Sequence, residues 1–322
     1  MNHYATIVDN PDFDPVVYAK ELDRAARAND KDFIVNMLTS ISNEQRQMMR
    51  DQYKTKYEKD VTSALEGLLG GDLEKTILAL MDTPLEYDVK QLKQAMKGSS
   101  TDALTLVEIF CSRTPDQLAA IRSYYEEQYG VPLEKDVGTA DVTSGEFKDL
   151  FVALVTGSKD TSDEVDDQQA KDDAARLYGD GKAMLVSKGA PSYFLNILAS
   201  QNEYQLRKVF ENFADLSGIT IEKAIENEFK GDLQKSFLTI VKAATDKQKF
   251  FAEQLYYSMK GLGTRDNDLI RVLVSRSEVD LDLIKNEFEM MYNTPLIDMI
   301  KGDTSGQYRD ALLALITGNR RY

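Results

Sequence analysis

Residues 306–316 read GQYRDALLALI. Gly306 opens this stretch, and apolar side chains follow it at Tyr308, Leu312, Leu315 and Ile316. Their spacing of i, i+4, i+7 and i+8 places them on one face of an α-helix. Three earlier glycines precede the same pattern: Gly71 with Leu73, Ile77, Leu80 and Met81, Gly145 with Phe147, Phe151, Leu154 and Val155, and Gly231 with Leu233, Phe237, Ile240 and Val241. The four glycines lie 74, 86 and 75 residues apart, which indicates four copies of one structural unit.

A second marker supports the fourfold repeat. Four serines each lie 13 residues before an aromatic residue, and the pairs are Ser40 with Tyr53, Ser112 with Tyr125, Ser200 with Phe213, and Ser275 with Phe288. Both markers place about a dozen extra residues before the third unit. This extra length coincides with residues 157–170, GSKDTSDEVDDQQA, which are acidic and lack aromatic side chains. Such a composition is typical of a solvated linker.

The fourth unit shows how its helices are divided. An apolar stripe that includes Leu255 and Met259 ends at GLGT, residues 261–264. We expect Thr264 to be the N-cap of the next helix, with Asp266 in its first turn. Similar interruptions predict about five short helices in each unit and about twenty in the chain, and no segment alternates as a strand does. The predicted fold class is therefore all-α.

The charge of the chain limits its partners. The 322 residues carry a net charge of −15, and the isoelectric point is near 4.7. Nucleic-acid binding needs a basic surface, so we expect none. An anionic membrane would also repel this chain unless something inverts the local charge.

Several other classes are excluded by what the chain lacks. Its one cysteine, Cys111, cannot form an internal disulfide, and its one histidine, His3, cannot build a zinc site or a catalytic triad. Residues 1–14 lack the pattern of a signal peptide, and no apolar run is long enough to span a membrane. We expect no catalytic residues, no organic cofactor and no enzymatic activity.

Two segments of the fourth unit contain a set of oxygens that suits Ca²⁺. MKGLGT, residues 259–264, can turn backbone carbonyls outward because glycine tolerates the required dihedral angles. KGDTSG, residues 301–306, supplies a carboxylate at Asp303, and Ca²⁺ often combines carbonyls with a bidentate carboxylate and water. The alternative from these residues alone is a tight turn and an aspartate that caps a helix.

The repeat and these two motifs together resemble the annexin family. The resemblance covers about residues 14–318 and is most specific in MKGLGT, in LIRVLVSRSEVDL (residues 269–281) and in MIKGDTSGQYRDALLAL (residues 299–315). It implies four repeats of five helices, with right-handed superhelical repeats packed into a curved disc. It also implies Ca²⁺-dependent binding to acidic phospholipid membranes. The implied metal ligands are the carbonyls of Met259, Gly261 and Gly263 and the carboxylate of Asp303.

The resemblance implies weaker or absent sites in the other repeats. In the second repeat the corresponding residues are Met96, Gly98, Ser100 and Asp141, with a serine at the second glycine position and the register of Asp141 left open. In the third repeat they are Gly189 and Glu228, and the alternative there is a surface loop and an ordinary exposed glutamate. In the first repeat Leu68 stands where the acid is expected and Glu66 is two positions away, so we expect no site.

The predicted organisation is a head at residues 1–13, repeats at 14–82, 83–157, 171–245 and 246–318, an acidic linker at 158–170 and a tail at 319–322. The leading function is Ca²⁺-dependent peripheral binding to acidic phospholipid, with Ca²⁺ as the bridging ion. The rival is a Ca²⁺-independent structural module associated with the cytoskeleton or with adhesion. We expect a cytoplasmic protein that is recruited to membranes when Ca²⁺ rises. Unconventional secretion, self-association on membranes and a partner protein are left open.

Overall fold

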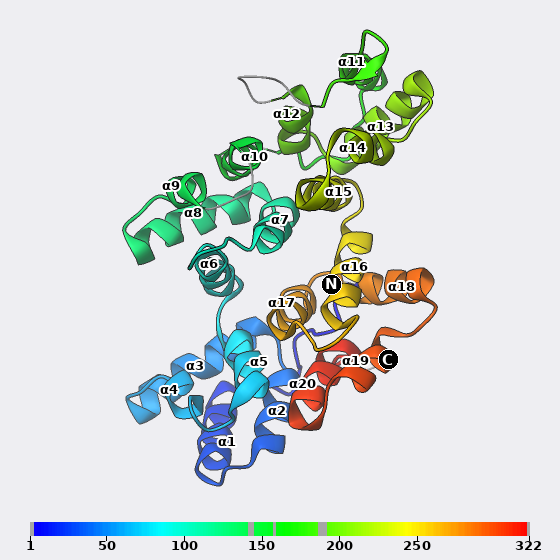
Figure 1. The fold of residues 1–322 in the computed structure, drawn as a ribbon. Helices are drawn as coiled ribbons and strands as arrows, with labels where there is room; N and C mark the ends of the chain where they lie inside the picture. Colours follow the sequence, from blue (N-terminus) through cyan, green and yellow to red (C-terminus); the bar gives the residue numbers. More distant parts are fainter. Residues whose placement is uncertain (1–2, 141–144, 157–158, 186–191, 321–322) are drawn as a thin grey trace. The chain divides into compact units, whose positions relative to one another are not determined.

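The computed structural model describes residues 3–140, 145–156, 159–185 and 192–320 (Figure 1). The chain forms two compact units. Unit 1 consists of Met1–Tyr87 together with Phe251–Tyr322, and unit 2 consists of Asp88–Phe250. The first and last quarters of the sequence therefore share one unit.

The described residues contain twenty helices in four groups of five, which confirms the all-α fold and the predicted helix count. Repeat I has α1 (Pro15–Arg27), α2 (Lys31–Thr39), α3 (Asn43–Tyr57), α4 (Val61–Leu65) and α5 (Gly71–Met81). Repeat II has α6 (Pro84–Ala95), α7 (Ala103–Ser112), α8 (Pro115–Tyr129), α9 (Leu133–Thr139) and α10 (Gly145–Thr156). Repeat III has α11 (Asp167–Leu177), α12 (Tyr193–Ser200), α13 (Glu203–Ser217), α14 (Ile221–Glu228) and α15 (Gly231–Thr245). Repeat IV has α16 (Lys247–Met259), α17 (Asp266–Arg276), α18 (Leu281–Tyr292), α19 (Leu296–Asp303) and α20 (Gly306–Thr317).

Most of the apolar positions that revealed the repeat are core positions. In the last helix of each repeat the buried members of the pattern include Ile77 and Leu80, Phe151 and Leu154, Phe237 and Ile240, and Leu312 and Leu315. The side chain of Phe147, which we also assigned to this pattern, lies outside the described residues. Burial of one face along a short helix is the main source of its stability, because helices of this length are marginal in isolation.

A short hairpin interrupts repeat III, where the sequence indicated no strand. β1 (Tyr178–Gly179) pairs antiparallel with β2 (Lys182–Ala183). Asp180 and Gly181 between them have φ of 52° and 73°, the left-handed values that a two-residue hairpin turn requires. Strands of two residues are too short to show alternation, so the Asp-Gly pair was the only signal in the sequence.

The N-terminal segment is bound to the end of the chain within unit 1. Ala5 and Ile7 are buried, and the N–H groups of Thr6 and Ile7 donate to the Ser277 carbonyl at 2.8 and 3.0 Å. Gly318 has φ of +78°, and a Cβ there would lie 2.1 Å from the Thr6 carbonyl oxygen. Only glycine therefore fits at this crossing, and the head packs as part of unit 1.

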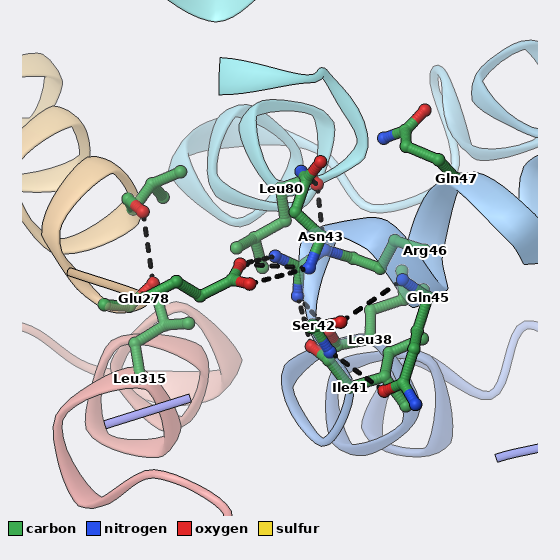
Figure 2. Close-up of polar contacts among 12 residues, drawn as sticks. Leu38, Ile41, Ser42, Asn43, Gln45, Arg46, Gln47, Leu80, Glu278 and Leu315 are labelled. Atoms are coloured by element: carbon green, nitrogen blue, oxygen red, sulfur yellow. Dashed lines mark hydrogen bonds and ion pairs between the residues drawn. The ribbon is translucent and has the colours of Figure 1, made fainter. Parts of the chain in front are cut away.

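A buried arginine joins the first and last repeats (Figure 2). Arg46 is 2 % exposed, and its guanidinium donates to the carbonyls of Leu38, Ile41 and Leu80 at 2.9, 2.7 and 2.9 Å. It also pairs with Glu278 at 3.1 Å. Burial lowers the pKa of Arg46 to about 10, although the Glu278 charge opposes this shift. Burial likewise raises the pKa of Glu278, and the Arg46 charge opposes that shift.

Glu278→Ala tests the importance of this pair. The substitution leaves a buried guanidinium without its counter-charge, and we expect it to lower the free energy of unfolding by about 2–3 kcal/mol. Glu278→Gln should cost less, because an amide oxygen can still accept from the Asn43 N–H, which donates to Glu278 at 3.0 Å. Urea unfolding provides the measurement. The control is Glu21→Ala, which breaks the exposed Arg24–Glu21 pair and should change stability by less than about 0.5 kcal/mol. Equal losses in Glu278→Ala and Glu21→Ala would contradict this account.

Candidate metal centre

The loop between α16 and α17 has the backbone conformation that a carbonyl-based metal site needs. Gly261 and Gly263 have φ of +107° and +81°, in the region that glycine adopts without strain. The Arg265 N–H donates to the Ser258 carbonyl at 2.8 Å and closes the base of the loop. Leu262 at the tip is fully exposed, so the loop projects into solvent. Its outer carbonyls are therefore accessible to an ion.

Asp303 lies beside this loop although it is 40 residues beyond Gly263. It is the last residue of α19, and its carboxylate accepts a hydrogen bond from the Thr264 hydroxyl. The same hydroxyl lies 3.4 Å from the Asp303 main-chain oxygen. The structure thus brings together the glycine loop and the carboxylate that we assigned to one site.

One of our local expectations for these residues was wrong. Thr264 does not cap α17: the N-cap is Arg265, which makes no side-chain capping bond, because the Thr264 hydroxyl is used on Asp303. Asp266 does lie in the first turn of α17, as expected. The alternative that Asp303 caps a helix also fails, because the N-cap of α20 is Ser305 and Asp303 ends α19.

The surroundings of Asp303 are electronegative. Partial burial is the main cause that raises the pKa of Asp266, and the charges of Asp72 and Asp303 raise it further against a hydrogen bond from Tyr308. In the described part of the chain, no lysine or arginine forms an ion pair with Asp303. Carbonyl oxygens with one carboxylate in a negative field suit a hard cation such as Ca²⁺.

The donor set also limits what kind of metal site this can be. Among the described residues, no group of three or more His, Cys, Asp or Glu side chains is placed to hold an ion. A site here must use main-chain carbonyls and leave some coordination positions to water or to an external ligand. An open site of that kind can join the protein to an anionic surface.

The corresponding loop of repeat II matches only in part. The Asp102 N–H donates to the Ala95 carbonyl at 2.8 Å, which repeats the closing bond of the repeat IV loop, and Gly98 has φ of +104°. Ser100 has no positive φ, so the backbone conformation at this position differs from that at Gly263. Met96 lies at the start of this loop and is half-buried. Asp141 lies outside the described residues.

Repeats III and I differ further. Gly189 lies outside the described residues, and Glu228 is exposed at the end of α14. In repeat I the loop between α1 and α2 has only three residues, Ala28–Asp30, and Glu66 is an exposed residue that follows α4. Leu68 supplies no ligand oxygen from its side chain.

Two features of these loops escaped our reading of the sequence. Leu262 is fully exposed at the tip of the repeat IV loop. The Lys31 ammonium donates to the Leu69 carbonyl at 3.4 Å in repeat I. The glycines on either side of Leu262 could have indicated its exposure. The Lys31–Leu69 bond joins residues 38 positions apart, and no motif in the sequence indicates it.

Comparison with known proteins agrees with the repeat and the loops. The annexin family model matches residues 18–80, 87–154, 182–240 and 250–315. The chain belongs to the annexin family. It is 41 % identical to annexin A5 of Mus musculus over 315 residues, which cover 97 % of this chain and 98 % of that protein. The solved structure of annexin III superposes with a TM-score of 0.91 at 34 % identity, covering 99 % of this chain and 98 % of that chain. The structure of calcium-bound annexin (Sm)1 superposes with a TM-score of 0.84 at 27 % identity, covering 98 % and 94 % of the two chains. Membership of this family implies Ca²⁺-dependent phospholipid binding in general terms.

The unequal loops predict unequal effects of removing each carboxylate. Asp303→Asn keeps the shape of the side chain but removes the negative charge of the expected ligand, so it should raise the Ca²⁺ needed for half-maximal vesicle binding most, by about tenfold. Glu228→Gln and Asp141→Asn should have smaller effects, and Glu66→Gln almost none. Co-sedimentation with phosphatidylserine vesicles over a Ca²⁺ series provides the measurement. A Glu66→Gln effect as large as that of Asp303→Asn would overturn the assignment.

Proposed function

We propose that this annexin binds acidic phospholipid surfaces through Ca²⁺ held between the α16–α17 loop and Asp303. The observation that supports the proposal is the hydrogen bond from the Thr264 hydroxyl to the Asp303 carboxylate, at the end of a loop in which Gly261 and Gly263 have positive φ. Ca²⁺ would be held by the carbonyls of Met259, Gly261 and Gly263 with Asp303, and it would supply a divalent positive charge for lipid oxygens. Met96, Gly98, Ser100 and Asp141, and Gly189 with Glu228, are proposed as weaker sites.

The charge of the protein explains why an ion is needed. A chain with a net charge of −15 is repelled by an anionic bilayer. An ion that completes its shell with lipid phosphoryl or carboxylate oxygens attracts both surfaces at once. Annexins are in general non-enzymatic membrane-binding proteins, and we propose no catalytic role. No helix in the described ranges combines the length and apolar character needed to cross a bilayer.

Vesicle co-sedimentation tests this function directly. We expect the protein to sediment with phosphatidylserine vesicles in Ca²⁺, to remain in the supernatant in chelator, and to bind phosphatidylcholine vesicles much less. The reason is that only the anionic headgroups offer both charge and oxygen ligands to the ion. Equal sedimentation in Ca²⁺ and in chelator would instead support the Ca²⁺-independent structural module.

The apolar tip of the repeat IV loop gives this binding a second component. Leu262 is fully exposed between two glycines whose carbonyls belong to the proposed site. When the ion brings the loop to the bilayer, the Leu262 side chain can leave water for the apolar part of the interface. Burial of a leucine contributes about 1.5–3 kcal/mol, so the loop tip should strengthen binding without contacting the ion. In repeat II the same position is Ser99, which is also exposed but polar.

Reciprocal substitutions at these two tips test the contribution. Leu262→Ser should lower the affinity for phosphatidylserine vesicles at saturating Ca²⁺ by about tenfold, because an apolar side chain is lost. Ser99→Leu should raise it, since it adds an apolar tip to a loop with the same closing bond. Ca²⁺ binding without vesicles and thermal stability should stay unchanged in both variants. If Leu262→Ser binds vesicles as the wild type does, the tip has no such role.

A further inference from the structure

The structure describes the corner before the last helix in repeats I, III and IV, and in repeats III and IV one carbonyl there receives a side-chain donor from that helix. In repeat IV the Arg309 Nε donates to the Thr304 carbonyl at 2.7 Å. In repeat III the Gln234 amide donates to the Phe229 carbonyl at 2.9 Å. Both carbonyls lie two residues before the glycine that begins the last helix, and both donors lie three residues after it. This carbonyl therefore needs a side-chain donor, because no described main-chain N–H of the helix bonds to it.

In repeat I the corresponding carbonyl receives its hydrogen bond from a lysine of another helix, α2. Three residues after Gly71 stands Glu74, a carboxylate that cannot donate. One of its carboxylate oxygens, Oε1, is buried without a hydrogen-bond partner. The corresponding carbonyl, that of Leu69, instead receives the Lys31 ammonium at 3.4 Å. A carboxylate and a carbonyl in one corner favour positive charge there.

Lys31 lies at the same edge of unit 1 as the proposed metal site. It is the first residue of α2, and the side chain of the next residue, Asp32, accepts from Gln307 of α20 at 2.9 Å. Gln307 is only four residues beyond Asp303. At the start of α5, Asp72 is close enough to raise the pKa of Asp266, as Asp303 does. The starts of α2, α5, α17 and α20 are thus gathered around one edge.

We propose that the Lys31 ammonium replaces the metal ion in repeat I and binds a phosphate oxygen of an anionic lipid headgroup without Ca²⁺. This inference rests on the proposed membrane function. The ammonium has three N–H donors, of which one is used on the Leu69 carbonyl, and the side chain is only half-buried. That bond restrains the flexible lysine stem and leaves two donors for another ligand. The repeat that has lost its glycine loop and its acid thereby keeps a positive charge at the edge that faces the lipid.

Lys31→Gln tests the proposal, because glutamine can still donate to the Leu69 carbonyl but carries no charge. At saturating Ca²⁺ its affinity for phosphatidylserine vesicles should fall by about fivefold, the effect of one basic residue at an anionic surface. The factor should be the same at every Ca²⁺ concentration that gives binding, and it should shrink as NaCl is raised. Lys31→Arg should bind as the wild type does. Ca²⁺ binding by Lys31→Gln in the absence of vesicles should be unchanged.

The matched control is Lys75→Gln. Lys75 is also a lysine of unit 1, but it is largely exposed and paired with Asp72 at 3.2 Å, so its removal should change vesicle affinity less than twofold. An equal loss in Lys75→Gln and Lys31→Gln would show that the effect comes from general charge and would overturn the proposal, as would wild-type affinity in Lys31→Gln.

Inorganic phosphate serves as the soluble probe. If phosphate stabilises the wild type but not Lys31→Gln while vesicle binding is unaffected, the lipid is the wrong source. A wild type that fails to bind vesicles in Ca²⁺ would overturn the proposed function itself, whereas failure confined to the Lys31 comparison overturns only this inference.

Discussion

Main-chain carbonyls at the ends of short helices need partners, and this constraint governs both the fold and the candidate site. Twenty helices in the described residues mean many carbonyls that no helical N–H can reach. The Arg46 guanidinium donates hydrogen bonds to three such carbonyls inside unit 1, and Glu278 compensates its charge. The guanidinium is therefore a structural cation, held where burial alone would disfavour it. A bound metal ion is a second kind of positive charge that can satisfy exposed carbonyls, by coordinating their oxygens.

The corners of the repeats show three chemical means of meeting the same requirement. Arg309 uses a guanidinium, Gln234 a neutral amide, and Lys31 an ammonium that comes from a different helix. Each leaves the backbone of the corner intact, which explains how the repeats can differ in side chains while keeping one fold. The repeat IV loop is different, because the positive φ of Gly261 and Gly263 suits the proposed role of its carbonyls as ligands of an external ion.

Much of the fold could be predicted because its signal is periodic. The pattern after Gly306 and its three counterparts defines buried helix faces, and the structure buries them. The pairing of the repeat IV loop with Asp303 could be expected from the resemblance to the annexin family, whereas the residues alone left a tight turn and a helix cap open. The role of Thr264 could not, because a threonine hydroxyl can cap its own helix or bond a distant carboxylate, and only the three-dimensional fold decides. The Lys31–Leu69 contact has the same origin: an ordinary lysine gains a role from the corner beside it.

The Thr264–Asp303 contact also bears on how readily the proposed site can bind. Without an ion, a free carboxylate would sample several rotamers, and each ordered side chain costs conformational entropy on binding. The Thr264 hydroxyl holds the carboxylate against the loop in advance, so less of that cost remains for the ion. The loop itself is closed by the bond between Arg265 and Ser258, which restrains its carbonyls in the same way. Repeat II has the equivalent closing bond but a serine without positive φ in place of the second glycine, so the restraint is present there while the backbone conformation differs. Differences in Ca²⁺ affinity between these repeats should therefore depend on the backbone conformation at the second glycine position more than on how firmly the loops are held.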